Sequence, residues 1–444
     1  DIVPESKKWN TVSLSSHEEC LKDKIKYASN FKIVEVESNK WQANRITQEV
    51  KGRNLVINPP FVTMTEQEMD MSFDLPYTRM PHPKYNKRGA IPSYEMIKFS
   101  INMHRGCFGG CSFCTISAHQ GKFIASRSEA SIMKEVDEMT KHPDFKGYIS
   151  DLGGPSANMY KMKGKDENIC ARCQAPSCIH PVICSNLDVS HKSLTDIYRK
   201  VDAHPGVKKA YVSSGVRYDL LVDDFNKNNQ DGNHDEYMEQ LVTKHVCGRL
   251  KVAPEHTGDA TLKIMRKPSF KYFKKFKEKY DKIQEKHGLK QPLIPYFISS
   301  HPGTTEEDMA NLAAETKELG FRLEQVQDFT PTPMTVATVI YYSGVHPYTL
   351  QPVETPKTKE DKQTQNNYFF WYKPEFRNWI RNRLTKLNRP DLAIQLLGDD
   401  KPKPANTWRK KGKEVMENEI KKSDGKPFQS KNDPKKHKNK FFKK

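Results

Sequence analysis

Hydrophobic and polar positions between residues 96 and 345 follow a repeating pattern in which short apolar runs alternate with amphipathic stretches. The apolar runs are Ile97–Ile101, Tyr148–Leu152, Ala210–Ser214, Leu250–Ala253, Leu293–Ile298 and Val326–Phe329. The stretches with helical spacing are Ser128–Lys141, Leu194–Ala203, Tyr237–His245, Tyr272–Lys286 and Thr305–Leu319. This alternation predicts an α/β fold with parallel strands and helical crossovers. An open doubly wound sheet and a full or partial barrel both fit, and both place chemistry at the C-terminal strand ends.

Residues 1–95 form a mixed α/β segment before this core. The pattern predicts a helix over His17–Ser29, a strand over Lys32–Glu37 and a second strand over Asn54–Asn58. A Pro- and Tyr-rich stretch, 74–92, predicts a loop. Because the chain begins with Asp1 rather than Met, we expect residues 1–95 to be a remnant of, or a linker from, an upstream domain that the chain lacks.

Residues 346–397 predict a helical extension, with Phe376, Trp379, Ile380 and Leu384 on one helix face. Residues 398–444 are Lys-rich and poor in apolar side chains, which predicts a disordered tail. The formal net charge of the chain is +18, and the 16 Lys and Arg against 5 Asp and Glu in 401–444 account for +11 of it. The charge therefore indicates at most weak nucleic-acid binding through the tail and says little about an active site.

Cysteine usage indicates the compartment. Seven of the nine cysteines fall between residues 107 and 184, in two tight groups, which is typical of metal binding in a reducing environment rather than of a disulfide scaffold. The chain has no apolar run of 18 residues and no signal-peptide pattern at its N-terminal end. We therefore expect a cytoplasmic protein without membrane association.

The first cysteine group, Cys107, Cys111 and Cys114, directly follows the first predicted strand. Three thiols in eight residues must surround one object, and Gly106, Gly109 and Gly110 allow the positive φ angles that such a loop needs. Structural zinc prefers four protein ligands, whereas a [4Fe–4S] cluster held by three cysteines keeps one iron open for a further ligand. The open cluster is favoured. The alternatives are buried core cysteines or a zinc site completed by His104 or His119.

In this context the motif resembles the radical S-adenosylmethionine (SAM) signature, with Phe113 as the aromatic residue before the last cysteine. The chain is most similar to the uncharacterised YgiQ-type radical SAM family over roughly residues 50–350. The segments that carry the resemblance are 104–114, Ser126–Glu129, Asp151–Tyr160, Ser213–Asp219, Lys251–Thr257 and His301–Thr305. The resemblance implies a partial (β/α)6 radical SAM barrel over 96–345, with a Cys-rich insert at 165–190. It also implies a variable tail and an N-terminal domain that this chain lacks.

The resemblance further implies the activity. A [4Fe–4S] cluster would bind SAM at its open iron and cleave it reductively to a 5′-deoxyadenosyl radical, with electrons from a donor such as flavodoxin or ferredoxin. The substrate is not indicated. No side chain stands out as a catalytic acid, base or radical relay, and Tyr218, Tyr296 and Cys247 are candidates only. Cys20 and Cys247 are expected to be inert thiols in apolar surroundings.

Polar residues after the predicted strands are candidate SAM contacts. Gly153 and Gly154 resemble the Gly-Gly-Glu motif of the superfamily, although Pro155 replaces the acid, so only a backbone contact carries over; a plain turn is the alternative. Ser214 and Arg217 follow the third strand, and Arg217 could bind the SAM carboxylate bidentately or be a solvated loop residue. Three further features follow later strands. Glu255 could accept hydrogen bonds from the ribose, and His256 could lie on the sulfonium side or be a structural histidine. The 301–305 turn could bind an anion or be a simple Pro-Gly turn with a cap.

The second cysteine group comprises Cys170, Cys173, Cys178 and Cys184. Four thiols in fifteen residues, in a segment with little secondary-structure signal, suggest a complete ligand set that orders the segment. A four-thiolate zinc site and an auxiliary [4Fe–4S] cluster are both suitable, and a disulfide pair is less so.

Three functions therefore compete. The first is a radical SAM enzyme of unknown substrate. The second is an RNA-modifying radical SAM enzyme, because the 251–267 segment and the Pro-Gly-Thr turn faintly resemble methylthiotransferases. The third is a non-enzymatic zinc protein that binds nucleic acid through its tail.

Overall fold

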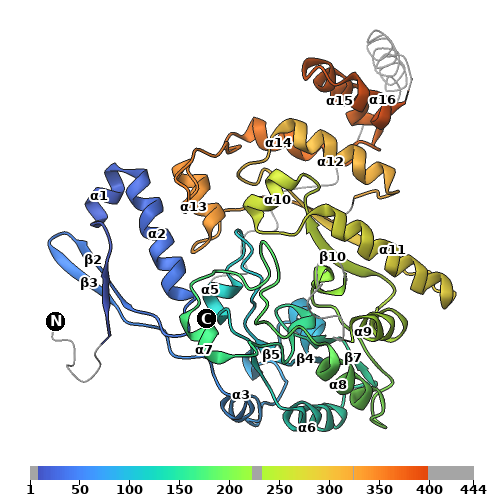
Figure 1. Cartoon of the computed structure of the whole chain (residues 1–444). Coiled ribbons are helices and arrows are strands. Elements are labelled where there is room, and N and C mark those ends of the chain that lie inside the picture. The colour runs from blue at the N-terminus through green and yellow to red at the C-terminus, as the bar shows by residue number, and fades with distance from the viewer. Residues whose placement is uncertain (1–8, 223–232, 324, 399–444) are drawn as a thin grey trace, which may run out of the picture. The chain divides into compact units, whose positions relative to one another are not determined.

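The computed structural model describes residues 9–222, 233–323 and 325–398 (Figure 1). The predicted disordered tail, 398–444, lies outside these residues except for Gly398. The chain divides into one unit of residues Asp1–Leu396 and a second of Leu397–Lys444, and the following description concerns the first. Among the helices of the described residues, none has the length and apolar character needed to cross a membrane.

Parallel strand pairs form the centre of this unit. They are β4 (Ser100–Asn102) with β8 (Asp151–Gly153), β7 (Tyr148–Ile149) with β9 (Lys209–Ala210), and β10 (Leu250–Glu255) with β11 (Leu293–Ser299), which pairs in turn with β12 (Gln325–Asp328). The Leu152 N–H donates to the Tyr211 carbonyl at 2.8 Å, which links the strand after β7 to the segment after β9. Each predicted apolar run overlaps a strand, and the mixed α/β fold is confirmed.

Amphipathic helices follow these strands. They are α6 (Glu129–Thr140), α8 (Lys192–Asp202), α9 (His234–Gln240) with a π-helical turn at Leu241–His245, α10 (Asp259–Met265), α11 (Phe270–Lys286) and α12 (Glu306–Glu318). Ser128 caps α6 by accepting from the Ser131 N–H. Thr305 caps α12 in a reciprocal pair with Asp308. Both predicted N-caps are confirmed, because a hydroxyl there satisfies a helix N–H that has no intrahelical partner.

The N-terminal segment holds β1 (Thr11–Ser13), α1 (His17–Lys22), α2 (Lys24–Ser38), β2 (Arg45–Val50) and β3 (Arg53–Ile57). β3 confirms the second predicted strand, but the strand predicted over 32–37 is wrong, since these residues lie within α2. Asp23 caps α2, and its Ala28 and Phe31 pack against Val336 and Ile340. The tertiary contact along one helix face therefore overrides the local β-branched pattern.

The remaining elements connect and extend the core. They are α3 (Glu66–Phe73), η1 (Pro83–Tyr85), α4 (Pro92–Ile97), β5 (His104–Arg105), α5 (Ile116–Gln120), β6 (Ala125–Ser126), η2 (Ala157–Met159), α7 (Glu167–Arg172), η3 (Tyr218–Leu221), α13 (Val336–Ser343), α14 (Lys359–Asn367), η5 (Tyr368–Phe370), α15 (Pro374–Lys386) and α16 (Pro390–Leu397). The predicted C-terminal helix is α15, which buries Ile380 and Leu384.

Candidate functional site

The loop that carries the first cysteine group runs from β5 to α5, on the C-terminal side of β4. Backbone hydrogen bonds fix it from several directions. The Cys107 N–H donates to Gly121 O at 3.0 Å, and the Ser112 N–H donates to Met265 O at 3.0 Å. The Ser112 carbonyl accepts from the Ala337 N–H at 2.8 Å. The loop is therefore held by the turn after α5, the end of α10 and the start of α13.

Glycines in this loop are required by its geometry. Gly106 has φ +92° and Gly110 has φ +60°, both in the left-handed region. A Cβ on Gly106 would lie 2.4 Å from the Phe123 carbonyl oxygen. The prediction of positive φ is thus confirmed at these two positions, but it is wrong for Gly109, which is not among the residues with positive φ. At Gly109 a Cβ would instead lie 2.9 Å from Arg217 Nη1.

The three thiols of the loop are neighbours, and each cysteine is half-buried. Burial, together with the nearby Cys111 thiol, raises the pKa of Cys107 to about 11. Burial and Cys111 also raise the pKa of Cys114. Among the described residues, no three His, Cys, Asp or Glu side chains have their donor atoms close enough together to coordinate one metal ion. The sulfur atoms are thus adjacent rather than preassembled.

The donor set nevertheless fits an iron–sulfur cluster held by three cysteines. The Arg217 guanidinium donates through Nη1 to Cys111 Sγ at 3.5 Å, a contact suited to an anionic sulfur ligand. Thiolates are the ligands that such clusters require, and burial in a loop with close backbone packing limits solvent access.

Arg217 is a buried cation with a buried carboxylate partner. Its Nε and Nη2 donate to the two oxygens of Asp219, at 2.9 and 2.5 Å. Burial opposes ionisation of Asp219, but the guanidinium outweighs burial and holds the pKa of that carboxyl below its usual value. The solvated-loop alternative for Arg217 is therefore wrong. The two guanidinium nitrogens Nε and Nη2, which could have bound a SAM carboxylate bidentately, are occupied by Asp219. The remaining nitrogen, Nη1, faces the cysteine loop.

Gly153 and Gly154 end β8, where protein side chains use the space that the glycines leave. A Cβ on Gly153 would lie 2.5 Å from Ser214 Oγ, and one on Gly154 would lie 2.4 Å from His104 Cε1. Ser214 donates its hydroxyl to Asp151, whose Oδ1 also accepts from the Ser213 N–H at 2.8 Å. The space beside the two glycines is thus used by protein side chains, organised by Asp151, and a backbone contact of these glycines to SAM stays a prediction.

Glu255 ends β10 in an unusual conformation. Its φ is +70°, it is buried, and its carboxylate lies 3.8 Å from Lys267 Nζ, beyond hydrogen-bond distance. Burial raises its pKa, against the opposing effect of Lys267 and Arg217. A non-glycine residue held at positive φ is a feature that clusters at ligand sites.

Several buried polar atoms near the ends of β10 and β11 have no hydrogen-bond partner among the described residues. They are His256 Nε2, Ser300 Oγ and Thr304 Oγ1. Ser300 also has φ +60°. Buried polar groups are normally satisfied, so these atoms mark the strand ends as a place where a ligand can supply partners. In the sequence, only the position of these residues after a predicted strand points to them. The positive φ of Ser300 cannot be predicted from the residue type.

The 301–305 turn packs on the cysteine loop. The His301 ring meets the Phe113 ring edge-on, with centroids 5.8 Å apart, and His301 Nε2 lies 3.5 Å from Ser112 Oγ. Thr305 and Asp308 already satisfy the start of α12. The turn therefore caps α12, as the alternative of a simple Pro-Gly turn with a cap predicted. His301 packs against the cysteine loop at Ser112 and Phe113.

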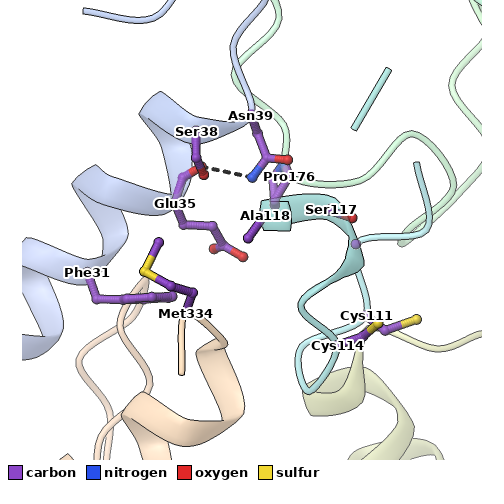
Figure 2. A pocket seen from close by; sticks show the side chains of 11 residues that line it. Phe31, Glu35, Ser38, Asn39, Cys111, Cys114, Ser117, Ala118, Pro176 and Met334 are labelled. Carbon is purple, nitrogen blue, oxygen red and sulfur yellow. Dashed lines mark hydrogen bonds between the residues drawn. The ribbon is translucent and has the colours of Figure 1, made fainter. Parts of the chain in front are cut away.

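A hollow opens beside two of the cysteines. It is lined by Cys111, Cys114 and residues of α2 and α5, together with Pro176 and Met334. Figure 2 shows Phe31, Glu35 and Met334 across this space from Cys111 and Cys114. The N-terminal segment thus forms one wall of the space next to the cysteine loop.

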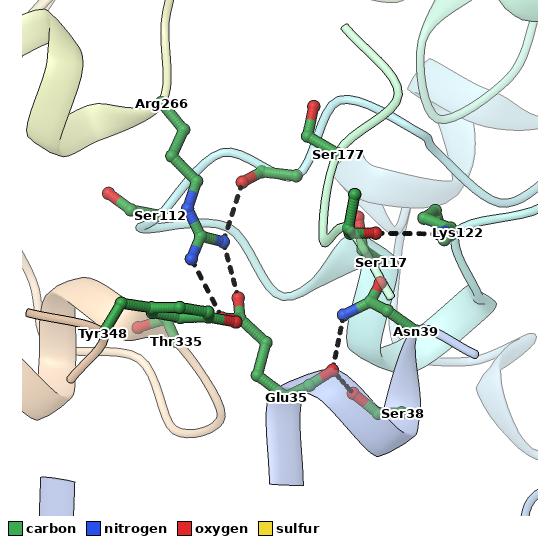
Figure 3. Close-up of polar contacts among 12 residues, drawn as sticks. Glu35, Ser38, Asn39, Ser112, Ser117, Lys122, Ser177, Arg266, Thr335 and Tyr348 are labelled. Carbon is green, nitrogen blue, oxygen red and sulfur yellow. Dashed lines mark hydrogen bonds and ion pairs between the residues drawn. The ribbon is translucent and has the colours of Figure 1, made fainter. Parts of the chain in front are cut away.

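A polar cluster ties that wall to the core. Arg266, at the end of α10, donates to both oxygens of Glu35 at 2.7 and 2.9 Å, and the Tyr348 hydroxyl donates to Glu35 Oε2 at 2.5 Å (Figure 3). Arg266 Nη1 also lies 3.5 Å from the Gly110 carbonyl oxygen. The cluster therefore joins α2, α10 and the cysteine loop.

The second cysteine group lies in the segment around α7, next to the first loop. All nine cysteines are described, and each is a free thiol. Burial raises the pKa of Cys178 to about 12, and the thiols of Cys173, Cys184 and Cys170 also raise it. The other three thiols of the group therefore lie close enough to Cys178 to influence its ionisation. Of the two isolated cysteines, Cys20 is buried as expected, whereas Cys247 is exposed, so its predicted apolar setting is wrong.

Comparison with known families gives three matches along the chain. A profile described as Radical SAM N-terminal matches residues 2–100, one described as Radical SAM superfamily matches residues 101–316, and a domain of unknown function, DUF3362, matches residues 324–440. The segment predicted as a remnant or linker thus matches a family profile of its own. The predicted absence of an upstream domain is not confirmed.

Relatives named UPF0313 protein align with most of the chain. The proteins from Bacteroides thetaiotaomicron and Porphyromonas gingivalis are 61% and 57% identical, over 87% and 91% of this chain and 62% and 64% of their own lengths. The Pseudomonas aeruginosa UPF0313 protein PA4928 is 43% identical, over 86% of this chain and 50% of that protein. The chain thus spans less than two thirds of each of these relatives.

Among solved structures, the radical S-adenosylmethionine methyltransferase TsrM from Kitasatospora setae is similar at a TM-score of 0.38 and 14% identity, covering 66% of this chain and 49% of that one. A likeness at this level does not bear on fold or function. Residues 101–316, the βα core with the cysteine loop after its first strand, are similar to the profile described as Radical SAM superfamily.

Proposed function

We propose that the protein is a radical SAM enzyme in which Cys107, Cys111 and Cys114 hold a [4Fe–4S] cluster. The observation that carries the proposal is the loop itself: three half-buried neighbouring thiols on a glycine-dependent turn, fixed by hydrogen bonds to the turn after α5, α10 and α13. Bound there, the cluster would pass an electron from an external reductant to SAM and so supply the chemistry of its reductive cleavage.

The chain's own residues position and shield these groups. Arg217, oriented by Asp219, donates toward Cys111 and stabilises negative charge on its sulfur. His301 and Ser112 hold the far side of the loop. The backbone at Gly153–Gly154, Ser214 and the carboxylate of Glu255 are proposed SAM contacts, with Glu255 as an acceptor for hydroxyl or ammonium groups. The unsatisfied polar atoms after β11 supply further partners.

The test is anaerobic reconstitution with iron and sulfide, followed by addition of SAM and a reductant. We expect about four irons at this site and formation of 5′-deoxyadenosine. Cys107→Ala is expected to lose this cluster and its product, and Cys247→Ala is the matched control because that thiol is exposed. A Cys107→Ala variant that keeps wild-type iron content and product would contradict the proposal.

The finer predictions remain part of this proposal. They are membership in the YgiQ-type branch, a flavodoxin or ferredoxin as electron donor, a cytoplasmic location and weak nucleic-acid binding by the tail. The tail lies outside the described residues, so no contact of it supports an RNA substrate.

A further inference from the structure

Lys122 is a buried cation beside the second cysteine group. Its exposed fraction is 1%, and its Nζ donates to the Ala175 carbonyl at 2.8 Å and to Cys173 Sγ at 3.7 Å. Its Nζ also lies 4.7 Å from the centre of the Phe123 ring. In the described part of the chain, no Asp or Glu carboxylate lies within ion-pair distance of it.

This environment requires a source of negative charge. An ammonium group removed from water is strongly disfavoured unless an anion or several good acceptors compensate for it. One carbonyl and one aromatic ring compensate only in part. Of the two atoms to which Lys122 Nζ donates, the one that can become anionic is the sulfur of Cys173.

The other three cysteines of the group share this neighbourhood. Cys170, Cys178 and Cys184 line one cavity together with Lys122. The Asn186 side-chain amide donates to Cys170 Sγ at 3.3 Å, and the Cys184 N–H donates to the Cys178 carbonyl at 2.8 Å. Hydrogen-bond donors to sulfur are typical of the surroundings of thiolate ligands.

We propose that Cys170, Cys173, Cys178 and Cys184 bind a second, coordinatively closed metal centre, with Lys122 as its buried counter-cation. Four thiolates with one Zn²⁺ or with one [4Fe–4S]²⁺ cluster carry a net charge of about −2. The centre therefore provides the anion that Lys122 lacks among carboxylates, and Lys122 offsets part of the charge of the centre. The metal is either zinc or an iron–sulfur cluster, since both accept four thiolates.

This centre is joined directly to the first cysteine loop. The Cys178 N–H donates to the Phe108 carbonyl at 3.0 Å, and the Ser177 hydroxyl donates to the Gly109 carbonyl at 2.8 Å. A Cβ on Gly110 would lie 2.5 Å from the Pro176 carbonyl oxygen, so the two segments pack without a gap. Metal binding at the second group is thus expected to order the loop of the first. The proposed centre goes beyond the radical SAM function and does not depend on it.

The test uses the full chain with Cys107, Cys111 and Cys114 all replaced by alanine, so that metal at the second group is measured alone. The purified variant is analysed for zinc, iron and sulfide, and is then loaded anaerobically either with zinc alone or with iron and sulfide. We expect about one zinc, or about four irons with sulfide, per chain. Adding Cys173→Ala should remove this metal, whereas adding Cys247→Ala should not.

The role of Lys122 is tested in the same background by competition with a chelator. Lys122→Met is expected to weaken metal retention by about tenfold or more, as loss of a group that contacts a metal ligand commonly does. Lys122→Arg keeps the charge and should retain the metal better, and Lys141→Met controls for loss of an exposed lysine. Equal retention in Lys122→Met and the parent would overturn the counter-cation role.

Two outcomes separate this inference from the proposed function. If the triple-alanine chain binds neither zinc nor iron while the wild type binds about four irons and forms 5′-deoxyadenosine, the second centre is wrong and the function stands. If the triple-alanine chain retains metal but the wild type forms no 5′-deoxyadenosine, the second centre stands and the proposed function is wrong. Should the triple variant not fold, the metal content of the wild type is compared with that of Cys170→Ala/Cys173→Ala, which must be lower.

Discussion

Both cysteine groups lie beside a buried cation that contacts one sulfur atom, but only one of these cations has a carboxylate partner. Arg217 lies 3.5 Å from Cys111 Sγ and is paired with the buried Asp219. Lys122 lies 3.7 Å from Cys173 Sγ and has no carboxylate at ion-pair distance in the described chain. At the first group the positive charge of Arg217 is therefore balanced by Asp219. At the second group the charge of Lys122 is balanced only if the sulfur atoms bind a metal as thiolates.

The backbone around the two groups differs in the same sense. The first loop is hydrogen-bonded to segments far from it in sequence, at Met265 and Ala337. In the second group only the Cys178 backbone N–H donates to the first loop, at Phe108 O, whereas the N–H groups of Cys170, Cys173 and Cys184 donate within their own segment, as Cys173 N–H does to Cys170 O at 3.1 Å. Folding of the core can thus form the first loop, while order in the second segment is expected to depend on metal.

The largest effect on stability is expected from Arg217→Met. This change leaves the carboxylate of Asp219 buried without its cation, which should lower the free energy of unfolding by about 3–5 kcal/mol. Urea unfolding measures it. The exposed pair Lys141–Glu138 is the control, because Lys141→Met should lower the free energy of unfolding much less than Arg217→Met does. Similar losses in the two variants would show that Asp219 is not dependent on Arg217.

The next effect concerns acid pH and the support of the first loop. Burial lowers the pKa of His301 from 6.5 to about 3, so between these values the unfolded chain binds a proton that the native protein does not. Stability therefore falls as pH decreases through this window, by roughly 3 kcal/mol at pH 4 for this one group. His301→Gln should lose less stability than the wild type between pH 7 and pH 4. His17→Gln, at an exposed site, should behave as the wild type does.

A smaller loss is expected where the N-terminal segment meets the core. Tyr348→Phe removes the hydroxyl that donates to Glu35 but keeps the pair of Glu35 with Arg266. The expected cost is about 1–2 kcal/mol, since the acceptor is charged. Hydrogen exchange of α2 should increase while exchange of α11 does not. Unchanged exchange in α2 would mean that this contact does not hold the segment.

The smallest effect on stability is expected from Lys122→Met in protein from which metal has been stripped. With no carboxylate left unpaired, replacing the ammonium by an apolar side chain of similar length should change the free energy of unfolding by less than about 1 kcal/mol. Urea unfolding of this variant beside Arg217→Met gives the contrast between the two groups directly. A loss as large as that of Arg217→Met would reveal an anion that Lys122 balances without metal.

Much of the fold could be predicted from the sequence because period and capping are local. The places of the core strands and the caps at Ser128 and Thr305 follow from apolar spacing and hydroxyl placement. The helix over 32–37 could not be predicted, because only the contact of Phe31 with the distant α13 decides it. The two groups of cysteines could be recognised from their spacing along the chain. The Asp219 partner of Arg217, the buried Lys122 and the positive φ of Ser300 depend on contacts or backbone angles that spacing does not encode.

The central claim is that the first cysteine loop holds a cluster that cleaves SAM. Its most direct test is the amount of 5′-deoxyadenosine formed per chain by the anaerobically reconstituted protein with SAM and reductant, beside Cys107→Ala prepared in the same way. The account predicts product from the wild type and at least about a hundredfold less from Cys107→Ala, because the open iron is lost with the ligand. Equal product from both proteins, or none from a wild type that contains the cluster, would contradict it.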